Sequence, residues 1–155
     1  MTEQICSVME TMGLNYFCEG EEFIVAEYIP FRLVFHITKE TLALFVEVNV
    51  DLPRQYTEEM LWYLNHKVLT NTEGNYVISE NNKISFRIFT DLKYLNEVSD
   101  KRIRDILHHA LWQIERDYPA MKKIAKGEYS WEEAVRVGYD GCMMWLEDIL
   151  IFADE

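Results

Sequence analysis

The clearest candidate for metal chemistry in this sequence is a group of three residues, Asp105, His108 and His109. In a helix, Asp105 and His109 share one face, where a carboxylate and an imidazole could bind one metal ion. The two side chains could equally form a surface ion pair, because carboxylate-histidine sites in helical bundles draw further ligands from other helices. The sequence has no second copy of this group, so we predict solvated side chains and no bound metal. A small enzyme or a metal site on this helix is the alternative from another functional class.

The remaining reactive residue types do not form a recognisable catalytic set. Cys6, Cys18 and Cys142 are widely spaced and contain no CxxC pair, which favours reduced, packed thiols over a disulfide framework or a zinc site. His36 and His66 each stand alone in the sequence. Signatures of phosphate-binding loops, dinucleotide sites, serine hydrolases, zinc proteases and EF-hands are absent. We therefore predict no catalytic residues and no cofactor.

Acidic residues are concentrated at both ends of the chain, whose formal net charge is −12. Residues 1–30 hold six acids and no Lys or Arg, and residues 128–155 hold eight acids and Arg136. Such ends repel phosphate, and no basic patch with interleaved aromatic residues offsets them, so we predict neither nucleic acid nor membrane as a partner. The sequence also lacks an apolar run long enough to span a bilayer and a basic N-terminal leader. We expect a cytoplasmic protein.

The periodicity of apolar residues predicts an α+β fold. Helical spacing up to Gly13 gives way to a period of two, and a second helix then separates two groups of strands. The predicted fold is an antiparallel twisted sheet flanked by helices, in the order α-β-β-β(-β)-α-β-β-α with an extra C-terminal helix. The predicted segments are a first helix before Gly13, strands within 15–29, 31–37 and 41–50, a helix from Thr57, a hairpin over 74–79 and 84–89, and a helix over 100–118.

The helices are predicted in more detail from their apolar faces and end signals. Thr57 is the expected N-cap of the second helix, Pro119 is expected to interrupt the long helix, and Ser130 with Glu133 forms a capping box for the last helix. We expect residues 1–127 to form the domain and residues 128–155 a helical appendage of it. The predicted inner positions are Met60, Leu61, Leu64 and Val68 in the second helix, and Ile103, Ile106, Leu107, Ala110, Leu111, Ile114 and Tyr118 in the long one.

Several large apolar residues fall outside these inner faces. Trp62 and Leu69 share the outer face of the second helix, and Trp112 lies opposite the inner face of the long helix. The last helix is apolar around most of its circumference, with Met143 on one of its two apolar faces, so it must be covered on two sides. We interpret Trp62, Leu69, Trp112 and Met143 as a candidate protein-binding or dimer surface. One interpretation is that the last helix packs over Trp112, so that each covers the other within one subunit, and the alternative is self-association through the Trp62 face.

The element order, together with a few short motifs, resembles the type III secretion chaperone-like fold and, within it, the YbjN-type family of candidate sensory-transduction regulators. The resemblance covers about residues 1–134. The matching residues are Leu64-Asn65, Gly74-Asn75-Tyr76-Val77-Ile78-Ser79, Asn82-Lys83-Ile84-Ser85-Phe86-Arg87, the long helix from Ser99, and Gly127 followed by Ser130 and Glu132-Glu133-Ala134.

The resemblance implies a small acidic protein without a cofactor, often a homodimer whose second helix lies at the interface. Trp62 and Leu69 agree with such an interface. We therefore expect a non-enzymatic regulator or adaptor that binds another polypeptide, whose identity the sequence does not give. A dedicated secretion chaperone for an effector protein is the alternative within the binding class, although residues after about 134 depart from the short chaperone pattern.

Overall fold

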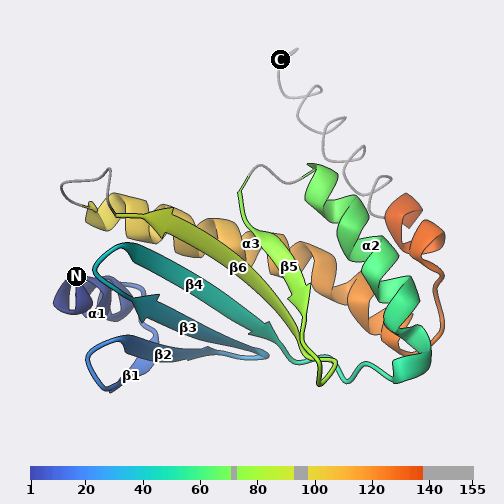
Figure 1. Cartoon of the computed structure of the whole chain (residues 1–155), viewed down its shortest axis with the longest axis horizontal. Coiled ribbons are helices and arrows are strands. Elements are labelled where there is room, and N and C mark those ends of the chain that lie inside the picture. Colours follow the sequence, from blue (N-terminus) through green and yellow to red (C-terminus); the bar gives the residue numbers. More distant parts are fainter. Residues whose placement is uncertain (71–72, 93–97, 138–155) are drawn as a thin grey trace, which may run out of the picture.

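A sheet of six antiparallel strands, in the order β1-β2-β3-β4-β6-β5, forms the centre of the protein (Figure 1). The computed structural model describes residues 1–70, 73–92 and 98–137, with the side chains of 68–70 left out. Helices α1 and α3 lie behind the sheet, and α2 lies beyond β5. The predicted α+β fold is confirmed. The elements are α1 (Thr2–Thr11), β1 (Asn15–Glu19), β2 (Phe23–Tyr28), β3 (Phe31–Ile37), β4 (Thr41–Val48), a 3₁₀ turn (Arg54–Tyr56), α2 (Thr57–Thr70), β5 (Asn75–Ile78), β6 (Ile84–Asp91), α3 (Asp100–Ala125) and a final helical segment over 131–137.

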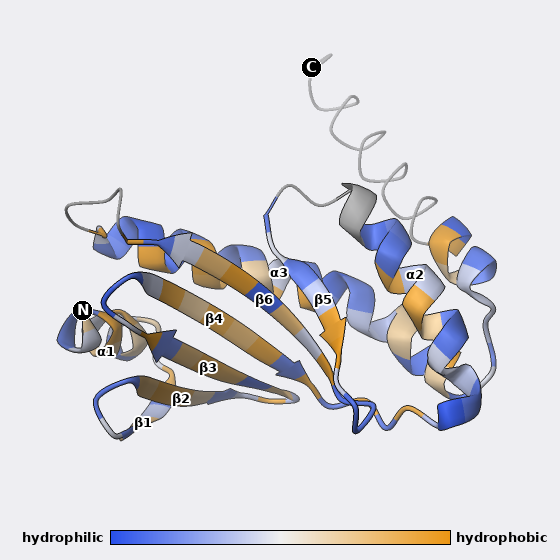
Figure 2. Ribbon diagram, in the orientation of Figure 1, coloured by the Kyte–Doolittle hydropathy of each residue, from blue (hydrophilic) through white to orange (hydrophobic). Residues whose placement is uncertain are grey.

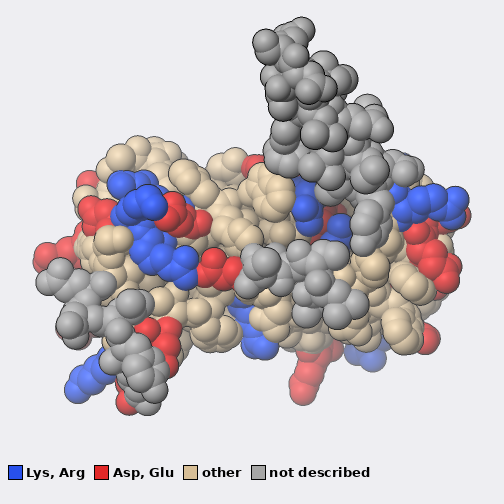
Figure 3. Space-filling model, turned by 90° about the horizontal axis from the view of Figure 1, so that it is seen from above, with Lys and Arg blue, Asp and Glu red and all other residues tan. Residues whose placement is uncertain are grey.

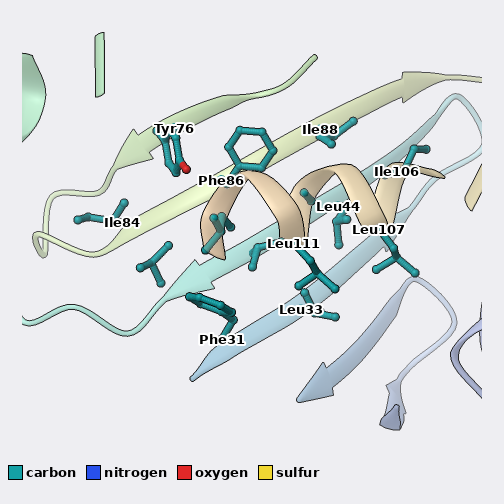
Figure 4. Packing of buried hydrophobic residues seen from close by; sticks show 14 of the residues in the cluster. Phe31, Leu33, Leu44, Tyr76, Ile84, Phe86, Ile88, Ile106, Leu107 and Leu111 are labelled. Carbon is teal, nitrogen blue, oxygen red and sulfur yellow. The ribbon is translucent and has the colours of Figure 1, made fainter. Parts of the chain in front are cut away.

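The alternation of side chains along each strand directs one face of the sheet toward the helices. In β3 the buried residues Phe31, Leu33 and Phe35 alternate with Arg32, which is exposed, and Val34, which is half-buried. Strands β2, β3, β4 and β6 are hydrophobic along much of their lengths (Figure 2). Their inward side chains meet the apolar face of α3 in one continuous core (Figure 4). The predicted alternation of β3, β4 and β6 is confirmed.

Helix α3 supplies the largest helical contribution to this core. Its N-cap is Ser99, whose hydroxyl accepts a hydrogen bond of 3.1 Å from the backbone N–H of Arg102. Six of the seven predicted inner residues are buried, and Tyr118 is half-buried. The helical period places all of them toward the sheet.

The prediction that Pro119 interrupts the long helix was wrong, because α3 continues to Ala125. Proline removes one backbone hydrogen bond, but Pro119 lies on the exposed side, where water can bond the carbonyl group that loses its partner. The buried face resumes beyond it with Met121 and Ile124, both 0% exposed. Tertiary packing on both sides of the proline therefore keeps the helix continuous.

Two predictions for α2 need correction. Leu61 is 44% exposed, whereas Tyr63 and Lys67 take inner positions at 1% and 9% exposure. The buried face of α2 therefore differs from the predicted one, since it includes Tyr63 and Lys67 and leaves out Leu61. The reason is that α2 packs against both β5 and α3. Thr57 is the first residue of the helix rather than its N-cap, and its hydroxyl accepts a 3.0 Å hydrogen bond from the Asn82 side chain.

Both hydrogen bonds of the predicted capping box after α3 are present, so this prediction is confirmed. The Ser130 hydroxyl accepts from the Glu133 backbone N–H at 3.2 Å, and the Glu133 carboxylate accepts from the Ser130 N–H at 2.9 Å. Segment 131–137 follows, and its Ala134 is completely buried. Residues 138–155 lie outside the described residues, so the predicted division at residue 127 remains a prediction.

Two glycines with positive φ give a test of the packing between β5 and β6. A Cβ atom on Gly74 would lie 2.6 Å from Phe86 Cζ and 2.8 Å from the Arg87 carbonyl oxygen, whereas one on Gly20 would meet nothing within 4 Å. We predict that Gly74→Ala lowers the free energy of unfolding by about 3 kcal/mol and Gly20→Ala by about 1 kcal/mol, measured by urea denaturation. Equal losses would contradict the close approach at Gly74.

Candidate protein-binding surfaces

The face of the sheet away from α1 and α3 carries a row of apolar side chains. Cross-strand pairing places Phe17 next to Val25, Val25 next to Val34, and Val34 next to Phe45. None of these side chains points toward the helices, because their strand neighbours fill the core. We call this surface the open face and define it by these four residues together with Phe23, Glu27, Arg32, His36, Glu47, Arg87 and Phe89.

Two aromatic rings of the open face are about half exposed, and a third is exposed to a smaller extent. Phe17 is 54% exposed, Phe89 is 55% exposed and Phe23 is 36% exposed. Phe89 packs edge-on against Phe45 with ring centroids 5.9 Å apart. Phe23 stacks on the ring of His36 at 4.5 Å. These contacts hold Phe23, Phe45 and Phe89 in place, and the exposed parts of Phe23 and Phe89 remain available for a further apolar contact.

The charges on the open face are unevenly distributed. Arg32 and Glu47 form a cross-strand ion pair of 3.6 Å, and both side chains are about half exposed, so the pair contributes little stability. The Arg87 guanidinium lies over the Phe89 ring, 5.5 Å from its centroid. Glu19 and Glu27 are exposed and form no ion pair with another described residue. The β1 and β2 side of the open face is therefore acidic.

A hollow of about 670 Å³ adjoins the open face at the β2–β3 turn. Ile29, 86% exposed, projects at this turn. The open face therefore runs into a concave region that combines apolar and charged groups. The wall of the hollow includes Glu27, Ile29, Pro30, Arg32, Glu47 and Lys83.

The first predicted surface residue, Trp62, lies on the outer side of α2 and is 54% exposed. Its ring stacks on that of Trp131, with centroids 6.1 Å apart. The Trp131 backbone N–H donates a 2.8 Å hydrogen bond to the Glu59 carboxylate, which fixes this neighbour. The Trp62 patch is thus shared between α2 and the segment after α3. The side chain of Leu69 and all of Met143 lie outside what the structure describes.

Trp112 lies on the outer side of α3 and is 55% exposed. The Arg116 guanidinium covers one side of the indole at 4.6 Å from the ring. Segment 131–137 contacts α2 through Trp131, as described above. The prediction that the last helix covers Trp112 concerns residues 138–155 as well, which are not described, so it stays untested.

Two of the three predicted metal candidates on α3, Asp105 and His109, contact other residues. Asp105 pairs with Lys101 at 3.5 Å, and His108 is exposed. His109 is half-buried, with Nε2 3.0 Å from the Glu73 carbonyl oxygen and its ring 6.4 Å from that of Phe86. The prediction of a solvated side chain is therefore wrong for His109, whereas Asp105 and His108 are exposed. Among the described residues no three His, Cys, Asp or Glu side chains come together as metal ligands.

The most polar part of the interior is a cluster between α2, β5 and α3 that sequence patterns did not indicate. One Asp117 carboxylate oxygen accepts from the Tyr76 hydroxyl at 2.8 Å and from the Gln113 amide at 2.6 Å. The other oxygen lies 3.4 Å from Lys67 Nζ. Burial, and then the nearby Asp117 carboxylate, raise the pKa of both Tyr63 and Tyr76.

This buried cluster holds helices and sheet together rather than presenting a reactive surface. The Asp117 side chain is 1% exposed, so a dissolved substrate cannot reach it. The raised phenol pKa values keep both tyrosines protonated, and Tyr76 needs its proton to donate to Asp117. The signal that could have indicated this cluster is the position of Asp117, which falls on the buried face of α3 three residues after Ile114.

Basic and acidic groups are mixed on the face seen from above, where Lys and Arg side chains lie beside Asp and Glu (Figure 3). This view shows no continuous basic surface over the described residues. Among the described residues, no helix has both the length and the apolarity to cross a membrane.

Comparison with known proteins supports the fold and not a sequence family. No protein-family model and no curated protein matches the chain. The crystal structure of YbjN from E. coli, described as a candidate transcription regulator, is similar with a TM-score of 0.54. The identity is 8%, and the match covers 74% of this chain and 85% of that one. The predicted YbjN-like fold is thereby confirmed, while membership of the family remains a prediction.

The buried cluster gives a prediction with a matched control on the same helix. Asp117→Asn removes the charge that faces Lys67 in the interior, and we expect the free energy of unfolding to fall by about 3 kcal/mol. Asp105→Asn removes an exposed partner of Lys101, and we expect a change within about 0.5 kcal/mol. Urea denaturation of both variants checks this. A loss at Asp105 as large as that at Asp117 would count against the assignment.

Proposed function

We propose that the protein is a non-enzymatic regulator or adaptor, and that its open face binds an apolar, positively charged segment of another polypeptide. The observation that carries this proposal is the row of aromatic rings across the sheet. Phe17, Phe45 and Phe89 come from three strands and lie on one side of the sheet, and Phe17 and Phe89 are each more than half exposed.

The energetics favour an apolar partner on this surface. Fully burying a Phe side chain contributes roughly 1.5–3 kcal/mol, so covering the exposed part of Phe17 or Phe89 contributes about 1 kcal/mol. Large exposed apolar side chains gathered on one face of a small protein mark interaction surfaces more often than scattered single residues do. Ring contacts hold Phe23, Phe45 and Phe89 in place, so binding has less motion of these three side chains to remove.

The charges favour a basic partner. Glu19 and Glu27 stand exposed beside Phe17 and carry no ion pair within the described part of the chain. The N-terminal thirty residues, which form α1, β1 and β2, contain six acids and neither Lys nor Arg. Lys or Arg side chains flanking an apolar segment would find complementary charge here, which also speeds encounter.

The assignment to a non-enzymatic class is supported by the chemistry of the described residues. The buried ionisable groups in mutual contact around Asp117 are sealed in the interior. The similar fold of YbjN is that of a protein described as a candidate transcription regulator. A dedicated secretion chaperone would use the same kind of surface, and no feature of the described residues favours it over an adaptor.

We further propose that the protein is a homodimer, with Trp62 at the interface. The ring is 54% exposed although Trp131 stacks on it, and Leu61 beside it is 44% exposed. A second copy placed on this patch would cover both side chains. The patch lies on α2, away from the open face, so dimer formation leaves the open face available.

Peptide binding provides the test of the open face. We expect a fluorescent peptide that alternates Leu with Lys to bind, and a peptide of equal length that alternates Leu with Glu to bind at least about tenfold more weakly. Phe17→Ser and Phe89→Ser should each weaken the Leu/Lys peptide about fivefold, which corresponds to about 1 kcal/mol. Fluorescence anisotropy measures these affinities.

Val137→Ser is the matched control, because Val137 is 51% exposed but lies after α3, away from the sheet. We expect this variant to bind like the wild type. If Val137→Ser weakened binding as much as Phe89→Ser, or if both peptides bound equally, the open face would not be the selective site.

The dimer is tested by light scattering of purified protein. We expect the wild type at twice the chain mass of 18.5 kDa and Trp62→Glu at the mass of one chain. A buried carboxylate at an apolar contact costs several kcal/mol, which is enough to separate a modest interface. Trp112→Glu, on another helix, should remain dimeric. A wild type with the mass of one chain would rule out the proposed dimer.

A further inference from the structure

Two cysteines outside the surface predicted around Trp62 and Trp112 lie next to each other in the fold. Cys6 is in α1 and Cys18 is in β1, and their Sγ atoms are 3.8 Å apart. Cys6 is partly buried, whereas Cys18 is exposed. The sequence spacing had suggested separate packed thiols. Strand β1 folds back alongside α1, and this brings the two thiols together.

The positions of both thiols are fixed by the elements that carry them. Cys18 pairs with Ile24 across the strands, and Ile24 in turn pairs with Phe35, so Cys18 belongs to the helix side of the sheet. Its neighbour Phe17 belongs to the open face. Tyr16 donates a 2.7 Å hydrogen bond to Glu10, which ties β1 to α1 beside the two thiols.

Strand β1 is a suitable place for a covalent link. It is an edge strand, paired only with β2, and four of its five residues are exposed. A disulfide needs the sulfur atoms about 2.05 Å apart, so they must approach by just under 2 Å. Rotation about the side-chain bonds and a small shift of β1 can provide this movement. An edge strand shifts more readily than a strand in the middle of the sheet.

We propose that Cys6 and Cys18 form a reversible intramolecular disulfide by exchange with a small disulfide such as glutathione disulfide. The exposed Cys18 thiolate attacks one sulfur of glutathione disulfide and releases one glutathione thiolate. The Cys6 thiolate then attacks the Cys18 sulfur and releases the second. One disulfide bond forms and one breaks, the two protein thiols are oxidised, and the two thiol protons pass through solvent to the two glutathione thiolates.

The order of the two steps follows from the surroundings of each thiol. Burial, and then the neighbouring Cys18, raise the pKa of Cys6, so a smaller fraction of Cys6 is thiolate. Cys18 is exposed to a dissolved disulfide, and Cys6 is placed to resolve the mixed disulfide that Cys18 forms. Cys6 therefore acts in the second, intramolecular step.

The link would fasten the strand that carries Phe17 to α1. Phe17 follows Tyr16 and precedes Cys18, so the disulfide would restrict the motion of one ring of the open face. If the open face binds peptide as proposed above, this restriction should tighten binding, because less motion remains to be lost. This regulatory effect rests on the proposed function, whereas the disulfide itself does not.

The test uses the full chain with Cys142→Ser, so that only the two neighbouring thiols remain. After incubation with glutathione disulfide, we expect a mass lower by two hydrogen atoms and a proteolytic fragment that joins Cys6 to Cys18. Adding Cys6→Ser should stop the reaction at a glutathione adduct on Cys18. In urea, the equilibrium constant for forming the disulfide should be at least about tenfold lower, because the fold no longer holds the thiols together.

Two results would overturn the disulfide: separate glutathione adducts on both cysteines, or an equilibrium constant that urea leaves unchanged. The Leu/Lys peptide then tests the regulatory effect, with binding to the oxidised form expected to be about threefold tighter or more. Unchanged affinity would overturn that effect and leave the disulfide standing. A protein that binds no peptide in either form would contradict the proposed function, while the mass measurement would still decide the disulfide.

Discussion

The structure depends on a geometric constraint: α1 and α3 cover one face of a six-stranded sheet, and the alternation of side chains sends every second residue to the other face. Inward residues such as Leu33 and Phe86 are completely buried against the helices. The residues between them must then face outward whatever their chemistry. On most such sheets the outward positions are polar. Here Phe17, Val34, Phe45 and Phe89 occupy them, which produces the open face on which the proposed function rests.

The buried cluster around Asp117 holds α2 against this framework. Lys67 comes from α2, Tyr76 from β5 and Asp117 from α3, so three elements meet through charge and hydrogen bonds rather than through apolar contacts alone. Such a cluster fixes one arrangement, because every misaligned alternative leaves a buried charge without its partner. Trp62 and Trp131 close the outer side of the same region. The buried cluster and the open face, where peptide binding is proposed, thus lie on different elements of the molecule.

Sequence patterns predicted the elements well where one periodicity dominated. The alternation in β3 and β4, the inner face of α3 and the Ser130 capping box are all local signals, and all are confirmed. The continuation of α3 past Pro119 and the exposure of Leu61 depend on distant packing, which local rules do not contain. The open face was missed for a related reason. Each strand shows only one or two outward apolar residues, and the row exists only after the strands are placed in register. Likewise, Cys6 and Cys18 become neighbours only because β1 folds back alongside α1.

The most direct measurement of the central claim is a methyl NMR titration of the protein with the Leu/Lys peptide. Val34 on the open face and Leu33 in the core are adjacent in β3 and point in opposite directions, so they form an internal comparison. We predict that the peptide shifts the Val34 methyl signals and shows intermolecular contacts to them, while the Leu33 signals change little. Contacts confined to the surroundings of Trp62 and Trp112, with Val34 unaffected, would contradict the account.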